Sequence, residues 1–180
     1  MSRDITFVHL TDLHIGDPAT DDHLFSDTAT TLREILAQVA TITPKPSFIV
    51  ASGDLSNRGD AESYVRLREI METIDLPVIY AIGNHDTREG FYEGMGIDTD
   101  APDAPFYHDR IVEGVYVITL DSSTPNYIGG TIEEGQFAWL ADTLDTHPEL
   151  PKLIVTHHPP ALGDGPDLAH LLPDMRCLAS

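Results

Sequence analysis

Four short apolar runs, rich in β-branched side chains, recur along the chain and predict buried strands. They cover residues 5–10, 48–51, 78–82 and 153–156. Three longer segments carry apolar residues at helical spacing and predict helices, over residues 22–40, 60–74 and 133–146. Because strands alternate with helices, the pattern indicates an α/β fold built from crossover units.

The remaining segments predict turns and loops. Residues 87–105 are rich in Gly, Asp and Pro and are expected to form a long loop, and a second loop is expected over residues 121–130. Residues 106–108 and 115–120 predict a hairpin that turns near Glu113-Gly114. Thr131-x-x-Glu134 has the spacing of a capping box before the last long helix, and a short helix is expected over residues 168–172. With 180 residues and no internal repeat, the chain is expected to be a single domain.

The composition of the chain bears on which partners it can bind and on where in the cell it is expected. The formal net charge is −20, and the two lysines are Lys45 and Lys152, so a broad basic surface for a nucleic-acid backbone is not expected. No run approaches the roughly 18 apolar residues of a membrane helix, so no membrane partner is expected. The single cysteine, Cys177, excludes a disulfide framework and makes a cytoplasmic location the expectation.

Each of the four predicted strands is followed by a polar motif. The motifs are Asp12-Leu13-His14, Gly53-Asp54, Gly83-Asn84-His85-Asp86 and His157-His158. Taken singly, such motifs are usually surface turns. Together, at the carboxyl ends of neighbouring strands, they converge where open α/β folds bind ligands. Their carboxylate, imidazole and amide groups predict a site for two divalent metals.

The residue types suggest how the ligands divide. In an extended backbone Asp12 and His14 would point to the same side, so both could bind one ion. The two oxygens of Asp54 make it the expected bridging ligand. Asn84 offers a neutral amide oxygen and His157 a further imidazole nitrogen.

The two residues after Asn84 are expected to serve the reaction itself. His85 is predicted to face the substrate, since its neighbour already occupies the ligand position. Asp86 is predicted to fix the tautomer of His85 through a hydrogen bond, a frequent role for a carboxylate beside an imidazole.

The motifs resemble those of the calcineurin-like metallophosphoesterase superfamily. The strings that carry the resemblance are His9-Leu-Thr-Asp-Leu-His14, Ser52-Gly-Asp-Leu55, Gly83-Asn-His-Asp86 and Thr156-His-His-Pro-Pro160. Three further features resemble the branch of class III cyclic-nucleotide phosphodiesterases and glycerophosphodiesterases: Leu120-Asp-Ser122, Gly130 and Gln136-x-x-Trp139-Leu140.

The resemblance implies an α/β/β/α sandwich, two sheets flanked by helices, with a dinuclear site of Fe, Mn or Zn. It implies that Asp12 and His14 hold one metal, that Asp54 bridges, and that Asn84 and His157 hold the second. A metal-bridging hydroxide would attack the phosphorus of a small phosphorylated substrate. His85 would stabilise or protonate the leaving group.

The sequence departs from the family pattern at its C-terminal end. The family carries a further Gly-His-x-His motif, whereas the histidine that follows His158 here is His170, within an apolar helical pattern. The domain over residues 1–180 is therefore expected to lack that region and to have an incomplete second sheet. An uncovered apolar face would favour a homodimer.

Three functions stay open on the sequence. A phosphodiesterase acting on a cyclic nucleotide or a glycerophosphodiester is favoured. A phosphomonoesterase with the same metal core, or a catalytically impaired binding or scaffold module, are the alternatives.

Overall fold

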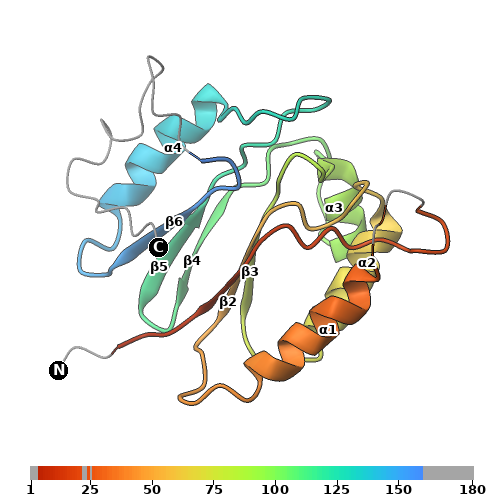
Figure 1. Cartoon of the computed structure of the whole chain (residues 1–180). Coiled ribbons are helices and arrows are strands. Elements are labelled where there is room, and N and C mark those ends of the chain that lie inside the picture. The colour runs from red at the N-terminus through yellow and green to blue at the C-terminus, as the bar shows by residue number, and fades with distance from the viewer. Residues whose placement is uncertain (1–3, 22–23, 25, 160–180) are drawn as a thin grey trace.

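Six strands form two sheets of three strands each in the computed structural model, which describes residues 4–21, 24 and 26–159. Figure 1 shows the two sheets side by side with helices on their outer faces. The short helix expected over residues 168–172, together with His170 and Cys177, lies outside the described residues.

The first sheet is entirely parallel. It holds β1 (Val8–Leu10), β2 (Ile49–Ser52) and β3 (Val78–Ala81) in the order β1-β2-β3. The crossovers are α1 (Thr28–Val39) and α2 (Ala61–Met71), each of which packs on the same face of the sheet. The three strands and the crossover arrangement predicted from the apolar runs are confirmed.

The second sheet is mixed. β4 (His108–Val112) and β5 (Val115–Thr119) form an antiparallel hairpin, and β6 (Lys152–Val155) pairs with β5 in parallel. The hairpin turns at Glu113 and Gly114, both with positive φ, as a two-residue turn between twisted strands requires. The predicted turn is confirmed, but the first strand begins at His108 and not at residue 106.

Strand alternation sorts the core into three layers. Val50, Ile79, Val117 and Val155 belong to the buried cluster between the sheets. The opposite face of the first sheet packs on α1, α2 and α3 (Arg88–Met95). The opposite face of the second sheet packs on α4 (Glu134–Asp145).

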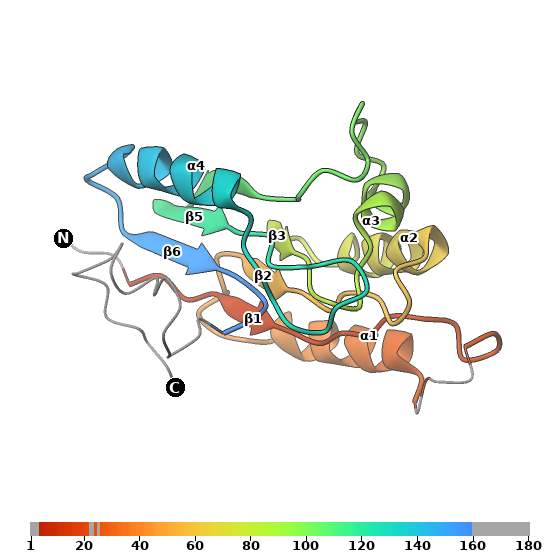
Figure 2. The same ribbon diagram turned by 90° about the horizontal axis from the view of Figure 1, so that it is seen from above.

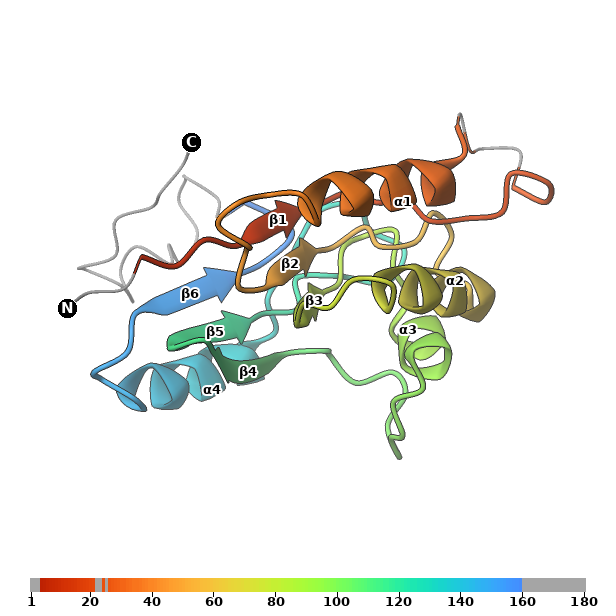
Figure 3. The ribbon, with the colours of Figure 1, turned by 90° about the horizontal axis from the view of Figure 1, so that it is seen from below.

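The result is the α/β/β/α sandwich that was predicted, with the layers visible edge-on in Figures 2 and 3. Within the described part of the chain the second sheet has three strands, and β6 has β5 as its one neighbouring strand. None of the described helices is long and apolar enough to cross a membrane.

The N-terminal ends of α1 and α4 differ from those expected, because the capping residues are not the ones that the sequence suggested. The first helix begins at Thr28 because the Asp27 carboxylate accepts a hydrogen bond from the Thr30 N–H, so the expected start at residue 22 is wrong. The predicted capping box before the last helix is also wrong. Glu133 occupies the N-cap position of α4 and makes no side-chain cap hydrogen bond.

Helix α3 lies inside the segment expected to be a loop. Its two glycines are weak helix formers, which hid it from the sequence pattern. In the fold they allow close packing, since a Cβ on Gly90 would collide with the Gly59 carbonyl and one on Gly94 with the Ala61 carbonyl. Thr87 caps the start of α3, and Gly96 ends it in the left-handed conformation.

Candidate metal centre

The polar motifs meet at the carboxyl edge of the first sheet, beside the end of β6. Two groups of side chains there carry ligand atoms within 4.8 Å of one another. One group is His14, Asp54 and His85, and the other is Asp12, Asp54 and His157. Asp54 belongs to both groups, which is the position required of a ligand that serves two ions.

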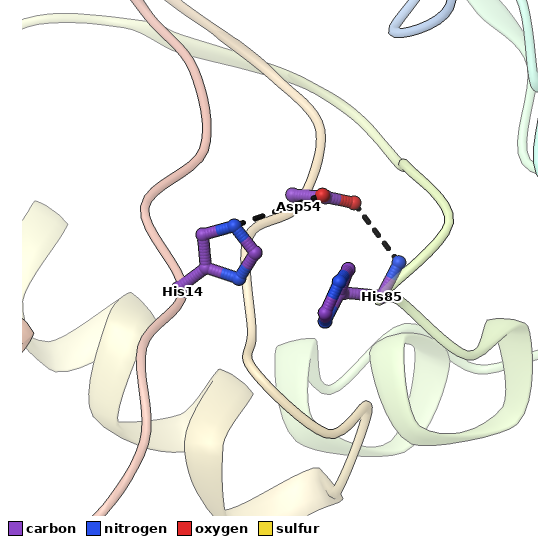
Figure 4. Close-up of side chains that lie close together, drawn as sticks. All are labelled: His14, Asp54 and His85. Carbon is purple, nitrogen blue, oxygen red and sulfur yellow. Dashed lines mark hydrogen bonds and ion pairs between the residues drawn. The ribbon is translucent and has the colours of Figure 1, made fainter. Parts of the chain in front are cut away.

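Asp54 directs its two oxygens at two different imidazoles. Oδ2 lies 3.7 Å from Nε2 of His14, and Oδ1 lies 3.4 Å from Nε2 of His157. Oδ1 also accepts a hydrogen bond of 2.9 Å from the backbone N–H of His85. Figure 4 shows Asp54 between His14 and His85. The carboxylate is 4% exposed, so these neighbours hold its orientation.

Backbone contacts orient the imidazole of His157. Its Nδ1 lies 3.1 Å from the Ser52 carbonyl oxygen, and because a carbonyl can only accept, Nδ1 must carry the proton. Nε2 is thereby the nitrogen turned toward Asp54, and it is the ring nitrogen that a metal could take once its proton is lost, an arrangement typical of metal-ligating histidines. The ring of His14 is not oriented in this way. Its Nδ1 is buried without a hydrogen-bond partner among the described residues.

The charges of Asp54 and His157 are coupled. Burial alone would raise the pKa of Asp54, but the hydrogen bonds from the His157 ring and the His85 N–H outweigh burial and hold that pKa below its usual value. The same contact with Asp54 raises the pKa of His157, against the opposing effect of burial. Without a metal, the two groups therefore tend towards a carboxylate and an imidazolium.

Three of these residues adopt left-handed backbone conformations. Asp12, His14 and Asp54 have φ values of 55°, 44° and 49°. The extended geometry predicted for Asp12 and His14 is therefore wrong. The two side chains still approach each other, with 3.9 Å between Oδ1 of Asp12 and Nε2 of His14. Strained conformations of this kind persist where the surrounding structure imposes them, often at functional sites.

Two glycines make room for the cluster. Gly53 has a φ of +112°, and a Cβ there would lie 2.7 Å from the ring of His157. A Cβ on Gly83 would collide with Oδ1 of Asp54 and would also lie 2.7 Å from the His157 ring. The donor set of carboxylates, imidazoles and an amide fits ions such as Fe, Mn or Zn.

Asn84 is half-buried and lines a cavity of about 550 Å³ together with His85, Arg88 and Ile128. A second cavity of about 540 Å³ lies next to Asp12 and His14. Both cavities are also lined by Asn57, Arg58 and His85. His85 thus lies between two hollows that each reach the cluster.

The predicted contact between Asp86 and His85 is not found, and that role is corrected. Nδ1 of His85 lies 3.0 Å from the carbonyl oxygen of Asn57, which places its proton on Nδ1. Asp86 is buried, and its oxygens accept hydrogen bonds from the backbone N–H groups of Leu55, Ser56 and Gly83 and from the Tyr64 hydroxyl. Asp86 therefore ties together the loops that carry Asp54 and His85.

Several supporting groups were not found from the sequence. The carbonyls of Ser52 and Asn57 orient two histidines, and no sequence signal marks a carbonyl because every residue has one. Tyr64 lies within the segment predicted as a helix, and an apolar pattern carries no signal for its hydroxyl. His158 belongs to the motif over residues 156–160, which predicts a ligand role for His157 alone.

Comparisons with known proteins show which family this sequence matches. The family described as calcineurin-like phosphoesterase matches residues 5–177. A probable cyclic nucleotide phosphodiesterase of Rhodococcus erythropolis is 35% identical, with 85% of this chain and 52% of that protein covered. The 3',5'-cyclic adenosine monophosphate phosphodiesterase of Pseudomonas aeruginosa is 31% identical, with coverages of 87% and 56%.

A third relative bears a different name. A probable glycerophosphodiester phosphodiesterase of Arcobacter nitrofigilis is 26% identical, covering 85% of this chain and 56% of that protein. The chain thus spans about half the length of the curated relatives that it matches. Since the family match covers nearly all of the sequence, the chain belongs to the calcineurin-like phosphoesterase family.

Proposed function

We propose that this chain is a metal-dependent phosphoesterase that hydrolyses a phosphodiester of the cyclic-nucleotide or glycerophosphodiester type. The observation that carries the proposal is the position of Asp54, whose two oxygens face separate imidazoles 3.4 and 3.7 Å away. The names of the relatives, which are cyclic nucleotide and glycerophosphodiester phosphodiesterases, support the substrate class.

In this proposal Asp12 and His14 hold one metal, Asp54 bridges, and Asn84 with His157 hold the second. When bound, such ions would polarise the phosphoryl group and lower the pKa of a water molecule. The chain itself supplies orientation. The Ser52 carbonyl and the open space at Gly53 fix the ring of His157, while the His85 N–H and the open space at Gly83 keep the Asp54 carboxylate in place.

His85 is proposed to hold the proton that the leaving alkoxide takes. Its Nδ1–H is bonded to the Asn57 carbonyl, so Nε2 is the nitrogen available to the substrate. The ring is exposed and stands at the boundary of both cavities, within reach of a phosphoryl group at the cluster.

The two cavities favour a diester over a monoester. A diester carries two ester groups, and the cavities extend from His85 on two sides, one lined by Asn84 and Arg88 and the other by Asp12 and His14. A monoester carries one ester group and would use one of them. The phosphomonoesterase alternative therefore leaves a cavity of about 540 Å³ without a use.

Turnover of bis(p-nitrophenyl) phosphate and of p-nitrophenyl phosphate, with Mn²⁺ or Zn²⁺ supplied, tests the proposal. We expect a higher kcat/KM for the diester, lost in Asp54→Asn and kept in Asp98→Asn, a matched change at an exposed aspartate. A preference for the monoester would establish the phosphomonoesterase alternative. Metal binding without turnover of either ester would indicate a binding module.

We also propose a homodimer and a cytoplasmic location. Phe7 is 39% exposed where it stacks on Phe48, and β1 pairs with β2 alone among the described strands, so this edge is open to a second copy. With a net charge of −20, added salt should strengthen such a homodimer by screening repulsion. Sedimentation that shows a monomer at every salt concentration would refute it. The single cysteine supports a cytoplasmic location.

A further inference from the structure

The imidazole of His158 connects the metal centre to the loop over residues 122–130. Its Nδ1 lies 2.7 Å from the Ser122 hydroxyl oxygen, and its Nε2 lies 3.2 Å from the Ile128 carbonyl oxygen. The backbone N–H of His158 also donates to the Ser122 hydroxyl, at 3.3 Å. The two ring nitrogens thus bond opposite ends of one loop, Nδ1 at Ser122 and Nε2 at Ile128.

One tautomer satisfies all of these bonds. The Ile128 carbonyl can only accept, so Nε2 carries the proton and Nδ1 accepts from the Ser122 hydroxyl. Ser122 is buried, and its oxygen in turn accepts from the His158 N–H. The ring is packed closely as well, because a Cβ on Gly130 would collide with it. On its other side the ring meets His157 edge-on, with 5.0 Å between centroids.

The anchored loop presents two exposed apolar side chains, and one of them lies next to the site. Tyr127 is 56% exposed and Ile128 is 83% exposed, the latter lining the cavity that contains Asn84 and His85. A tight turn directly precedes Ile128, with the Tyr127 N–H bonded to the Thr124 carbonyl at 3.1 Å. We call Tyr127 and Ile128 the apolar lip. An apolar group of a ligand in the cavity would cover this surface, and the removal of both apolar surfaces from water would favour binding.

We propose that His158 is a positioning residue that holds the apolar lip over the cavity, and that the lip selects phosphodiesters with an apolar or aromatic ester group. The proposal rests on the phosphodiesterase function proposed above. In it, His158 binds neither metal nor substrate, and acts through the loop between Ser122 and Ile128.

The anchoring is tested by hydrogen exchange of the metal-free chain. In His158→Asn the shorter amide can still bond Ser122 but cannot reach the Ile128 carbonyl, so amides of residues 124–130 should exchange faster. His147→Asn, at an exposed histidine beyond the end of α4, is the matched control and should leave this loop unchanged. Gly130→Ala should have the same effect by displacing the ring, and it serves as the second variant should His158→Asn fail to fold. Unchanged exchange in the folded variants would overturn the anchoring.

Selection by the lip is tested by calorimetric binding of diphenyl phosphate and dimethyl phosphate to the Mn²⁺-loaded chain. We expect the wild type to prefer the diphenyl anion, and Ile128→Ala and His158→Asn each to reduce that preference about three- to tenfold. Dimethyl phosphate binding and metal content should stay unchanged. An equal loss for both anions would overturn the lip and place His158 in the metal site. If the wild type turns over no diester yet keeps the binding preference, the proposed function fails and this inference stands.

Discussion

Replacement of Asp86 by asparagine should destabilise the fold by an amount that the hydrogen bonds define. Oδ1 accepts from the Ser56 N–H at 3.0 Å and from the Tyr64 hydroxyl at 2.9 Å. Oδ2 accepts from the Gly83 N–H at 2.8 Å and from the Leu55 N–H at 3.1 Å. Asparagine keeps the shape of the side chain but has one oxygen and one NH₂ group, which cannot accept.

The two orientations of the new amide differ in their cost. With the NH₂ group at the Oδ2 position, two buried backbone N–H groups would face a donor. With the NH₂ group at the Oδ1 position, the Ser56 N–H loses its acceptor, and the Tyr64 hydroxyl, which already accepts from the Thr87 N–H, can accept from the new amide by turning its own proton away. The second orientation is therefore favoured, because it leaves one buried backbone N–H without an acceptor and not two, and each buried unsatisfied donor costs about 1–3 kcal/mol. Alanine at this position should cost more, since it leaves all four donors without a carboxylate.

Urea unfolding followed by circular dichroism measures this loss. With an m-value of about 1–3 kcal/mol per molar urea, a loss of about 2 kcal/mol should lower the unfolding midpoint by roughly 1 M at unchanged m. Asp98→Asn, the same change at an exposed position, is the control. A midpoint for Asp86→Asn equal to that of the control would show that the carboxylate does not bind these loops together.

Of three other predictions, two concern the metal centre and one concerns His108 at the start of β4. Asp54→Ala should remove bound metal more completely than other single changes, and elemental analysis that finds two metals in this variant would refute the bridging role. His85→Ala should keep its metals yet lose about 10²–10⁴-fold in turnover, as for removal of a general acid, whereas a parallel loss of metal would make His85 a ligand. Burial lowers the pKa of His108 below its usual 6.5, against the opposing hydrogen bond to the Tyr80 carbonyl, so the unfolded chain binds the proton more readily. The free energy of unfolding should therefore fall as the pH drops below about 6.5, by at most about 1.4 kcal/mol per pH unit, and His108→Gln should remove that part of the slope.

The sequence predicted the parallel sheet, β5 and β6 well because these strands lie within short, mainly apolar runs, whereas β4, which begins His108-Asp109-Arg110, was expected two residues too early. It failed for α3, where Gly90 and Gly94 serve contacts with distant carbonyls and not local helix formation. Such contacts arise from the tertiary fold, and a local pattern does not contain them.

The candidate site was predictable in its residue types and less so in its geometry. The ligand types follow directly after the strands, so their convergence could be inferred from a parallel sheet. The left-handed backbones at Asp12 and His14, and the Asn57 carbonyl that takes the place expected for Asp86, depend on how neighbouring loops meet. The contacts between these loops are made by hydrogen bonds between segments far apart in the chain.

The left-handed backbones at Asp12, His14 and Asp54 also bear on how this protein could be engineered. For a side chain with a Cβ, such a conformation costs about 1–2 kcal/mol relative to glycine. Glycine at any of the three positions would relieve that cost and remove a candidate ligand in the same step. A selection for thermal stability alone would therefore favour variants that discard the metal centre, and any such library should be screened for retained metal together with melting temperature.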